Sequence, residues 1–166
     1  MISLGSTDIT LSRMGLGTWA IGGGPAWNGD LDLQICIDTI VEAHRCGINL
    51  IDTAPGYNFG NSEVIVGQAL KQLPRREVVV ETKCGIVWER TGSLFNKVGD
   101  RQLYKNLTPE SIREEVEASL QRLGIDTIDI YMTHWQSVEP CFTPIAETVA
   151  TLNALKKEGK IRSIGA

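Results

Sequence analysis

Short apolar segments alternate with longer amphipathic segments along the chain. The apolar segments are rich in β-branched and aliphatic residues and are bounded by polar or glycine-containing turns, a pattern typical of strands. Their starts lie roughly 30 to 50 residues apart, the length of a strand–helix unit with its crossover. The pattern predicts strands at residues 14–18, 48–53, 78–82, 127–133 and 161–165.

Three of the intervening segments carry apolar residues at helical spacing, over residues 33–44, 108–123 and 143–155. Thr108 and Thr143 each stand directly before a proline, and a hydroxyl at that position is expected to cap the first turn of a helix. A glycine follows each of the three segments, as is common after a last helical turn. We therefore expect amphipathic helices between the strands.

Strict alternation of strands and helices favours a parallel sheet, either an open doubly wound sheet or a (β/α)8 TIM barrel. No G-x-G-x-x-G or G-x-x-x-x-G-K-[ST] motif follows the first strand, so an open nucleotide-binding fold loses support. A barrel is the better prediction, with a small hairpin over residues 2–10 in front of it. A complete barrel takes roughly 250 residues. Residues 1–166 are therefore expected to form one α/β domain that holds about the first half: the hairpin, four βα units and a fifth strand.

The composition adds constraints on partners and location. The chain is 42% hydrophobic and 22% charged, with a formal net charge of −4, which is ordinary for a globular domain. It has no run of Lys or Arg, which argues against nucleic acid or an anionic membrane as a partner. No apolar stretch approaches the roughly 18 residues of a membrane span, and residues 1–10 do not resemble an export signal. The four cysteines form no C-x-x-C pair and no H-x-H motif occurs, so we expect free thiols in a reducing cytoplasm and no metal site.

Reactive side chains stand at the ends of the predicted strands. In chain order the strand ends bring residues 17–19, Asp52 with the nearby Tyr57, Lys83 and His134. Barrel enzymes place catalytic groups at the carboxyl ends of their strands, so we expect these side chains on one face. A phenol with a pKa near ~10 is a poor proton donor at neutral pH. A neighbouring ammonium lowers that pKa, a carboxylate can hold the ammonium in place, and an imidazole can hydrogen-bond a substrate oxygen.

The same residues carry a resemblance to a known family. Residues 52–63 resemble the D-T-A-x-x-Y-x-x-G-x-S-E signature of the aldo-keto reductases. Further segments fit the family in the right order, at residues 15–19, 81–83, 129–134 and 159–165. The resemblance covers the whole chain. It implies the first half of an aldo-keto reductase barrel, closed at its base by the N-terminal hairpin.

The resemblance also implies residue roles and an activity. Tyr57 would be the general acid that protonates a carbonyl oxygen, with Lys83 lowering its pKa, Asp52 pairing with Lys83, and His134 orienting the carbonyl. The implied activity is the reduction of small aldehydes, ketones or dicarbonyl compounds with NADPH or NADH, which supplies the hydride. The sequence does not distinguish the two cofactors, because the residues that do so in the family would lie beyond Ala166. The residues expected beside the cofactor are Gly17, Thr18, Trp19 and Asp52.

All four tryptophans follow strands and are expected on the same face: Trp19, Trp27, Trp88 and Trp135. We interpret them as aromatic walls of a substrate pocket. The alternative, that they merely pack the rim of the barrel, is equally plausible for Trp27. The long segment at residues 85–107 follows the third strand, and it is either a substrate lid or an ordinary surface loop.

Half a barrel would leave two parallel strand edges without partners, at residues 14–18 and 161–165. Such edges and an exposed apolar interior promote pairing and aggregation, so self-association is a further expectation. Three interpretations follow: a partial sequence of a complete reductase, a truncated inactive remnant, or a half-barrel that closes by pairing with a copy of itself or a partner. The alternative to catalysis is a non-catalytic, truncated or cofactor-sensing module.

Overall fold

A computed structural model of the chain describes residues 1–27 and 31–166. Five parallel strands form one sheet in the order β10-β9-β5-β4-β3, so neighbours in the sheet are neighbours in the chain order of the five. This sequential order is that of a barrel, and it differs from a doubly wound sheet, whose strand order reverses. The strands are β3 (Gly15–Gly17), β4 (Leu50–Asp52), β5 (Val79–Cys84), β9 (Ile128–Thr133) and β10 (Ile161–Gly165).

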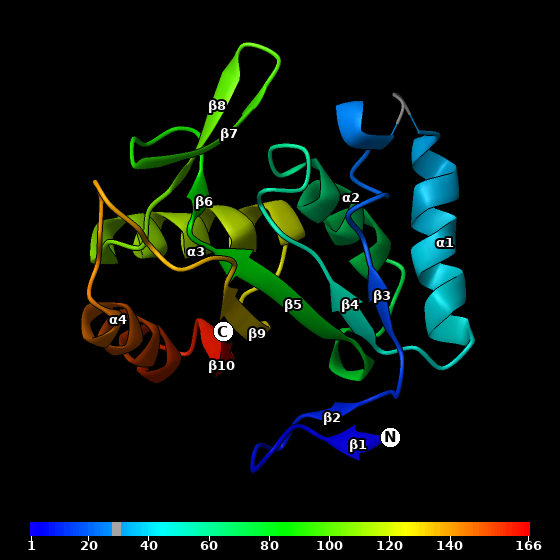
Figure 1. The fold of residues 1–166 in the computed structure, drawn as a ribbon. Coiled ribbons are helices and arrows are strands. Elements are labelled where there is room, and N and C mark those ends of the chain that lie inside the picture. Colours follow the sequence, from blue (N-terminus) through cyan, green and yellow to red (C-terminus); the bar gives the residue numbers. More distant parts are fainter. Residues whose placement is uncertain (28–30) are drawn as a thin grey trace.

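Helices cover the outer face of this sheet, with α1 and α4 at its two flanks (Figure 1). They are α1 (Leu33–Arg45), α2 (Asn61–Leu70), α3 (Pro109–Leu123) and α4 (Ile145–Lys157), together with the 3-10 turns η1 (Pro25–Trp27) and η2 (Arg75–Glu77). A core of buried aliphatic side chains fills the space between helices and sheet, for example Ile40, Val66, Ile112, Val116 and Leu155. Among the described residues, no helix is both long enough and apolar enough to cross a membrane.

The predicted helix ends are partly confirmed. Thr108 caps α3, where its side chain accepts a hydrogen bond from the Ser111 amide. The prediction for Thr143 is wrong, because α4 begins after Pro144 and has no side-chain cap. Thr143 instead exchanges two backbone hydrogen bonds with the Ser137 hydroxyl, at 2.8 and 2.9 Å. These contacts stabilise the loop before α4.

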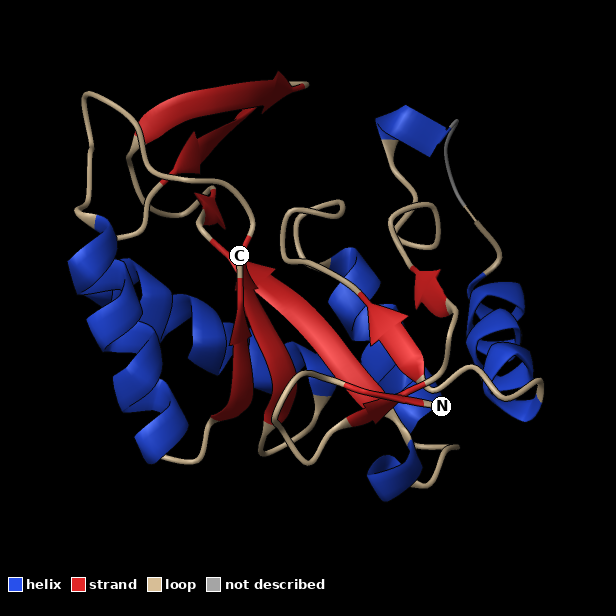
Figure 2. Ribbon diagram, turned by 60° about the horizontal axis from the view of Figure 1, so that its bottom comes forward, coloured by secondary structure: helices blue, strands red, loops and turns tan. Residues whose placement is uncertain are grey.

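The predicted hairpin forms from β1 (Ile2–Ser3) and β2 (Thr10–Leu11). It lies across the amino ends of the parallel strands (Figure 2). Ile9 and Leu11 pack there against Val79 and Ile130 in a small second core. The hairpin thereby covers the base of the sheet.

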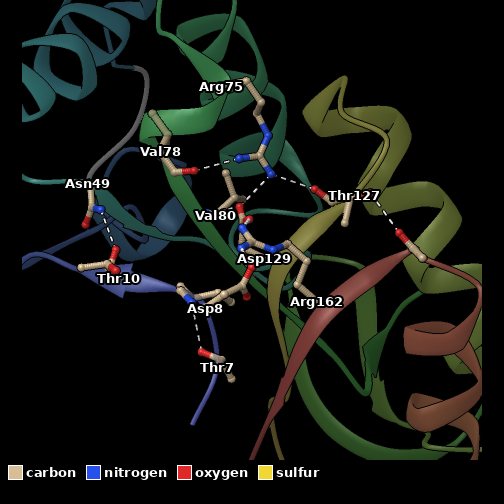
Figure 3. Close-up of polar contacts among 12 residues, drawn as sticks. Thr7, Asp8, Thr10, Asn49, Arg75, Val78, Val80, Thr127, Asp129 and Arg162 are labelled. Carbon is tan, nitrogen blue, oxygen red and sulfur yellow. Dashed lines mark hydrogen bonds and ion pairs between the residues drawn. The ribbon is translucent and has the colours of Figure 1, made fainter. Parts of the chain in front are cut away.

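An ionic network ties this base together (Figure 3). Asp129 is 1% exposed, and it accepts hydrogen bonds from the Val80 amide at 2.9 Å, Arg75 Nη2 at 2.7 Å and Arg162 Nη1 at 2.6 Å. Arg162 also reaches Asp8 in the hairpin, at 3.1 Å. A buried carboxylate is thus matched by two guanidinium groups, which offsets the cost of its burial.

The long segment after β5 is not an irregular surface loop, and its place beside the candidate cavity leaves the substrate lid as a prediction. It folds into a three-stranded antiparallel sheet in the order β6-β8-β7, and we call it the insert sheet. Its strands are β6 (Ile86–Val87), β7 (Ser93–Val98) and β8 (Arg101–Lys105), and it stands at the carboxyl end of the parallel strands (Figure 1). The Ser93 hydroxyl donates to Val138 O and accepts from the Cys141 amide, which fastens the insert sheet to the loop after β9.

Candidate active site

The four reactive side chains expected at the strand ends lie together. Asp52 ends β4, Lys83 lies near the end of β5, His134 directly follows β9, and Tyr57 stands in the loop between β4 and α2. Lys83 Nζ donates to Asp52 Oδ1, to Thr53 O at 2.9 Å and to Tyr57 Oη at 3.3 Å. The rings of Tyr57 and His134 meet edge to face, with centroids 5.8 Å apart. One ammonium group therefore bridges a carboxylate and a phenol beside an imidazole.

Burial and charge set the protonation of two of these groups. Burial alone would lower the pKa of Lys83, but its hydrogen bond to Asp52 and the Asp52 charge outweigh burial and raise it. Lys83 is therefore a stable cation. The pKa of His134 falls to about 4, first because the ring is buried and second because Lys83 is positive. The imidazole is consequently neutral at pH 7, and its Nδ1 is buried without a hydrogen-bond partner among the described residues.

A tight turn holds Tyr57 in place. Asn58 and Phe59, directly after it, both have left-handed backbones, with φ of 53° and 54°. Such values are rare for a bulky residue and persist where the surroundings enforce them. The Asn58 side chain donates to Gly22 O at 2.9 Å, and the Gly60 amide donates to Pro55 O at 2.7 Å. The loop after β3 therefore helps to fix the turn that carries the phenol.

The end of β3 lies beside Asp52. Gly17 pairs in register with Asp52, and Thr18 is fully buried. Trp19 is 52% exposed. Its ring lies 6.3 Å from that of Tyr57 and 5.2 Å from that of Trp27, between ring centroids.

Tyr57, His134 and Trp19 line a cavity of about 680 Å³, whereas Asp52 and Lys83 lie behind its lining. Its walls come from the loops after β3, β4 and β9 and from the insert sheet, and its aromatic lining consists of Trp19, Tyr57, Phe59, Phe95, His134 and Trp135. A larger cleft, about 1,100 Å³, lies at the opposite end of the sheet around Arg75, Asp129 and Arg162. None of the four reactive residues lines it, so the smaller cavity is the candidate site.

The structure places the four tryptophans differently with respect to this cavity. Trp19 and Trp135 line it, whereas Trp27 contacts the Trp19 ring from outside the lining. Trp88 lines a separate small pocket beside Glu115. Its ring and that of Phe59 meet edge to face, with ring centroids 5.6 Å apart. Two of the four therefore support the walls rather than form them.

Three residues around the site were not among the predicted site residues. Phe59 and Phe95 line the cavity, and Phe59 stands inside the signature segment where its position next to Tyr57 was visible. Glu81 pairs in register with Asp52, two residues before Lys83. Burial raises the pKa of the Glu81 carboxyl, and the negative charge of Asp52 raises it further. Alternation along β5 points Glu81 to the same face as Lys83, a signal present in the sequence, and the strand register adds its pairing with Asp52.

Comparison with known proteins follows this geometry. The sequence profile described as "Aldo/keto reductase family" matches residues 13–166. The chain is 90% identical to the NADH-specific methylglyoxal reductase of Escherichia coli over 165 residues, which cover 99% of this chain and 51% of that protein. It is 44% identical to an aldo-keto reductase of Bacillus subtilis, over 98% of this chain and 45% of that protein. The chain thus spans about half the length of the curated relatives it matches.

Solved structures agree with the sequence relatives. A glycerol dehydrogenase from Gluconobacter oxydans superposes with a TM-score of 0.81 at 41% identity, over 99% of this chain and 47% of that one. The holo form of an aldo-keto reductase from Bacillus halodurans superposes with a TM-score of 0.80 at 32% identity, over 99% of this chain and 48% of that one. The strand order, the hairpin and these matches confirm the first half of the barrel. The chain belongs to the aldo/keto reductase family.

Proposed function

We propose that Tyr57, Lys83, Asp52 and His134 carry out the reduction of small aldehydes and ketones, methylglyoxal foremost, with NADH or NADPH as the reductant. The observation that carries the proposal is the Lys83 ammonium placed between Asp52 Oδ1 and Tyr57 Oη. The proposed substrate and the preference for NADH are those of the 90% identical E. coli protein, an NADH-specific methylglyoxal reductase. NADPH stays an alternative because a Klebsiella pneumoniae aldo-keto reductase, 32% identical with a TM-score of 0.67, is solved in complex with NADPH.

The residues present fit a nicotinamide beside them. His134 Nδ1 is a buried polar atom that finds no hydrogen-bond partner in the described part of the chain, and His134 lines the same cavity as Tyr57 and Trp19. Gly17 leaves the approach to Asp52 open, since a Cβ there would lie 3.9 Å from Asp52 Oδ2. We propose that this chain contributes Gly17, Thr18, Trp19 and Asp52 to the cofactor site. For the substrate pocket, we propose Trp19 and Trp135 as walls and Trp27 and Trp88 as their supports.

The chemistry divides between cofactor and protein. The nicotinamide, when bound, supplies a hydride to the carbonyl carbon. Tyr57 passes its phenolic proton to the carbonyl oxygen, and the Lys83 ammonium stabilises the phenolate that remains until water returns a proton. Asp52 keeps Lys83 oriented through their ion pair. Neutral His134 holds the carbonyl oxygen with an N–H hydrogen bond, which fixes the carbonyl for transfer.

Two forms of the protein test this proposal. One is the 166-residue chain itself, and the other is a chimera in which this chain replaces the matching half of the E. coli reductase. NADH consumption with methylglyoxal and NADH fluorescence are measured for both. We expect turnover in the chimera. NADH binding without turnover would support the cofactor-sensing module instead, and an inactive, well-folded chimera beside an active E. coli parent would contradict the proposal.

We propose a cytoplasmic location for the protein. All four cysteines are free in the structure, which is usual for proteins of a reducing compartment. Fractionation of the native cells tests this assignment, and recovery of the protein outside the cytoplasm would contradict it.

A further inference from the structure

Three buried hydroxyls meet beneath the ends of β3 and β4. Thr18, Thr53 and Ser62 are each fully buried. Ser62 Oγ lies 2.7 Å from Thr18 Oγ1 and 2.9 Å from Thr53 Oγ1, and it donates to Thr18 O at 2.9 Å. Thr18 Oγ1 donates to Asp52 O, also at 2.9 Å. Ser62 is the central member of this cluster, which we call the hydroxyl hub.

The three hydroxyl groups of the hub have fewer hydrogens to donate than they have hydrogen-bond contacts. Its three hydroxyls carry one hydrogen each, and they make four contacts. Two contacts end on the carbonyl oxygens of Asp52 and Thr18, which only accept. The remaining hydrogen, that of Thr53, therefore points to Ser62 Oγ. When the Thr18 hydroxyl instead donates its hydrogen to Ser62 Oγ, Asp52 O still accepts a hydrogen bond from the Thr18 amide, at 2.9 Å.

The hydroxyl hub holds the main chain at the carbonyl group of Asp52 and at Thr53, the next residue. Asp52 O accepts from the amide and the hydroxyl of Thr18, and Thr53 O accepts from Lys83 Nζ at 2.9 Å. The Ser62 amide donates to Tyr57 O at 3.3 Å. Trp19, next to Thr18, lies against the Tyr57 ring. The Ser62 side chain thus links the segments of Thr18 and Thr53, and its backbone amide adds the segment of Tyr57.

We propose that Ser62 is a positioning residue for the reduction, acting through Thr18 and Thr53 on the relative placement of Asp52, Lys83, Tyr57 and Trp19. The inference rests on the proposed function, because its kinetic consequence requires turnover. Ser62 does not line the cavity, so it acts without touching the substrate. A catalytic group displaced by about 1 Å costs up to ~100-fold in rate. A small displacement caused by the loss of the Ser62 hydroxyl is therefore measurable.

The chimera with Ser62→Ala tests the proposal against the matched variant Ser119→Ala. Ser119 is an equally buried serine in α3, and its hydroxyl accepts from Arg122 Nη2 at 3.3 Å. We expect both variants to lower the melting temperature similarly. Only Ser62→Ala lowers kcat, at least ~10-fold, with the KM for methylglyoxal changed much less. Ser62→Cys, which keeps a weak donor of similar shape, recovers part of kcat. Thr53→Val, which removes the hydrogen directed at Ser62, lowers kcat in the same direction.

A second readout is independent of turnover. The near-ultraviolet circular dichroism lost in Trp19→Phe identifies the signal of the Trp19–Tyr57 cluster. Ser62→Ala is expected to diminish that signal and Ser119→Ala to preserve it. If the wild-type chimera does not reduce methylglyoxal, the proposed function fails, and the dichroism still decides whether Ser62 positions the cluster. A Ser62→Ala variant with unchanged kcat and unchanged dichroism would overturn the inference.

Discussion

Among single residues, Lys83 has the most consequential surroundings. Its side chain is 11% exposed, and it donates to a carboxylate, a carbonyl and a phenol at once. The Asp52 charge overcomes the effect of burial, so the ammonium stays protonated across the physiological pH range. Lys83 can therefore stabilise negative charge on Tyr57 Oη without losing its own proton.

His134 carries the first prediction. Its pKa falls from 6.5 to about 4, because burial and the positive Lys83 disfavour the imidazolium. We expect the His134 ring proton signal in NMR to stay constant from pH 8 to pH 5 and to move only below that range. The unfolded chain binds this proton near pH 6.5, so the contribution of His134 to stability is complete above pH 6.5 and is lost as the pH falls toward 4.

The assignment of that signal is simple, because the chain has two histidines. His44→Gln leaves one histidine signal, which belongs to His134. A midpoint near 6.5 for this signal would contradict the burial and charge that the structure gives the ring.

At the scale of secondary-structure elements, Asp129 connects β9 with β5, β10 and η2 (Figure 3). We expect Asp129→Asn to lower the free energy of unfolding by about 3 kcal/mol, because two guanidinium groups lose their buried partner. Urea unfolding measures the change. The exposed Asp126→Asn serves as the control and is expected to change the value by less than about 0.5 kcal/mol. Equal effects of the two variants would contradict a structural role for the network.

The elements also show what the sequence reveals. The five strands and the helices α1, α3 and α4 follow from apolar periodicity. The strand ends follow in turn, so Asp52, Lys83 and His134 could be placed on one face. The insert sheet was missed because residues 85–107 mix polar and apolar positions without sustained alternation. Trp88 was expected in the cavity, but Gly85, with φ of 99°, redirects the chain after β5. The hydroxyl hub joins residues 44 positions apart, and no local pattern encodes such contacts.

At the scale of the described chain, the parallel sheet is open at both edges. Within the part of the chain that the structure describes, β3 and β10 each pair with one neighbour, β4 and β9 respectively. Unpaired parallel edges favour association. We expect the 166-residue chain to sediment above its mass of 18.2 kDa, with a share of larger species that rises with concentration. Sedimentation at 18.2 kDa over a hundredfold range of concentration would contradict self-association through the edges.

In the proposed function, the described strands contribute the acid–base groups and one wall of the cofactor site. The proposed reduction depends most on Tyr57 as the donor of a proton to the carbonyl oxygen. Stopped-flow oxidation of bound NADH by methylglyoxal, compared between the chimera and its Tyr57→Phe variant, tests it most directly. We expect unchanged NADH binding and a loss of at least ~100-fold in the rate of oxidation, within the range that a positioned general acid supplies. Oxidation at the parental rate in Tyr57→Phe would contradict it.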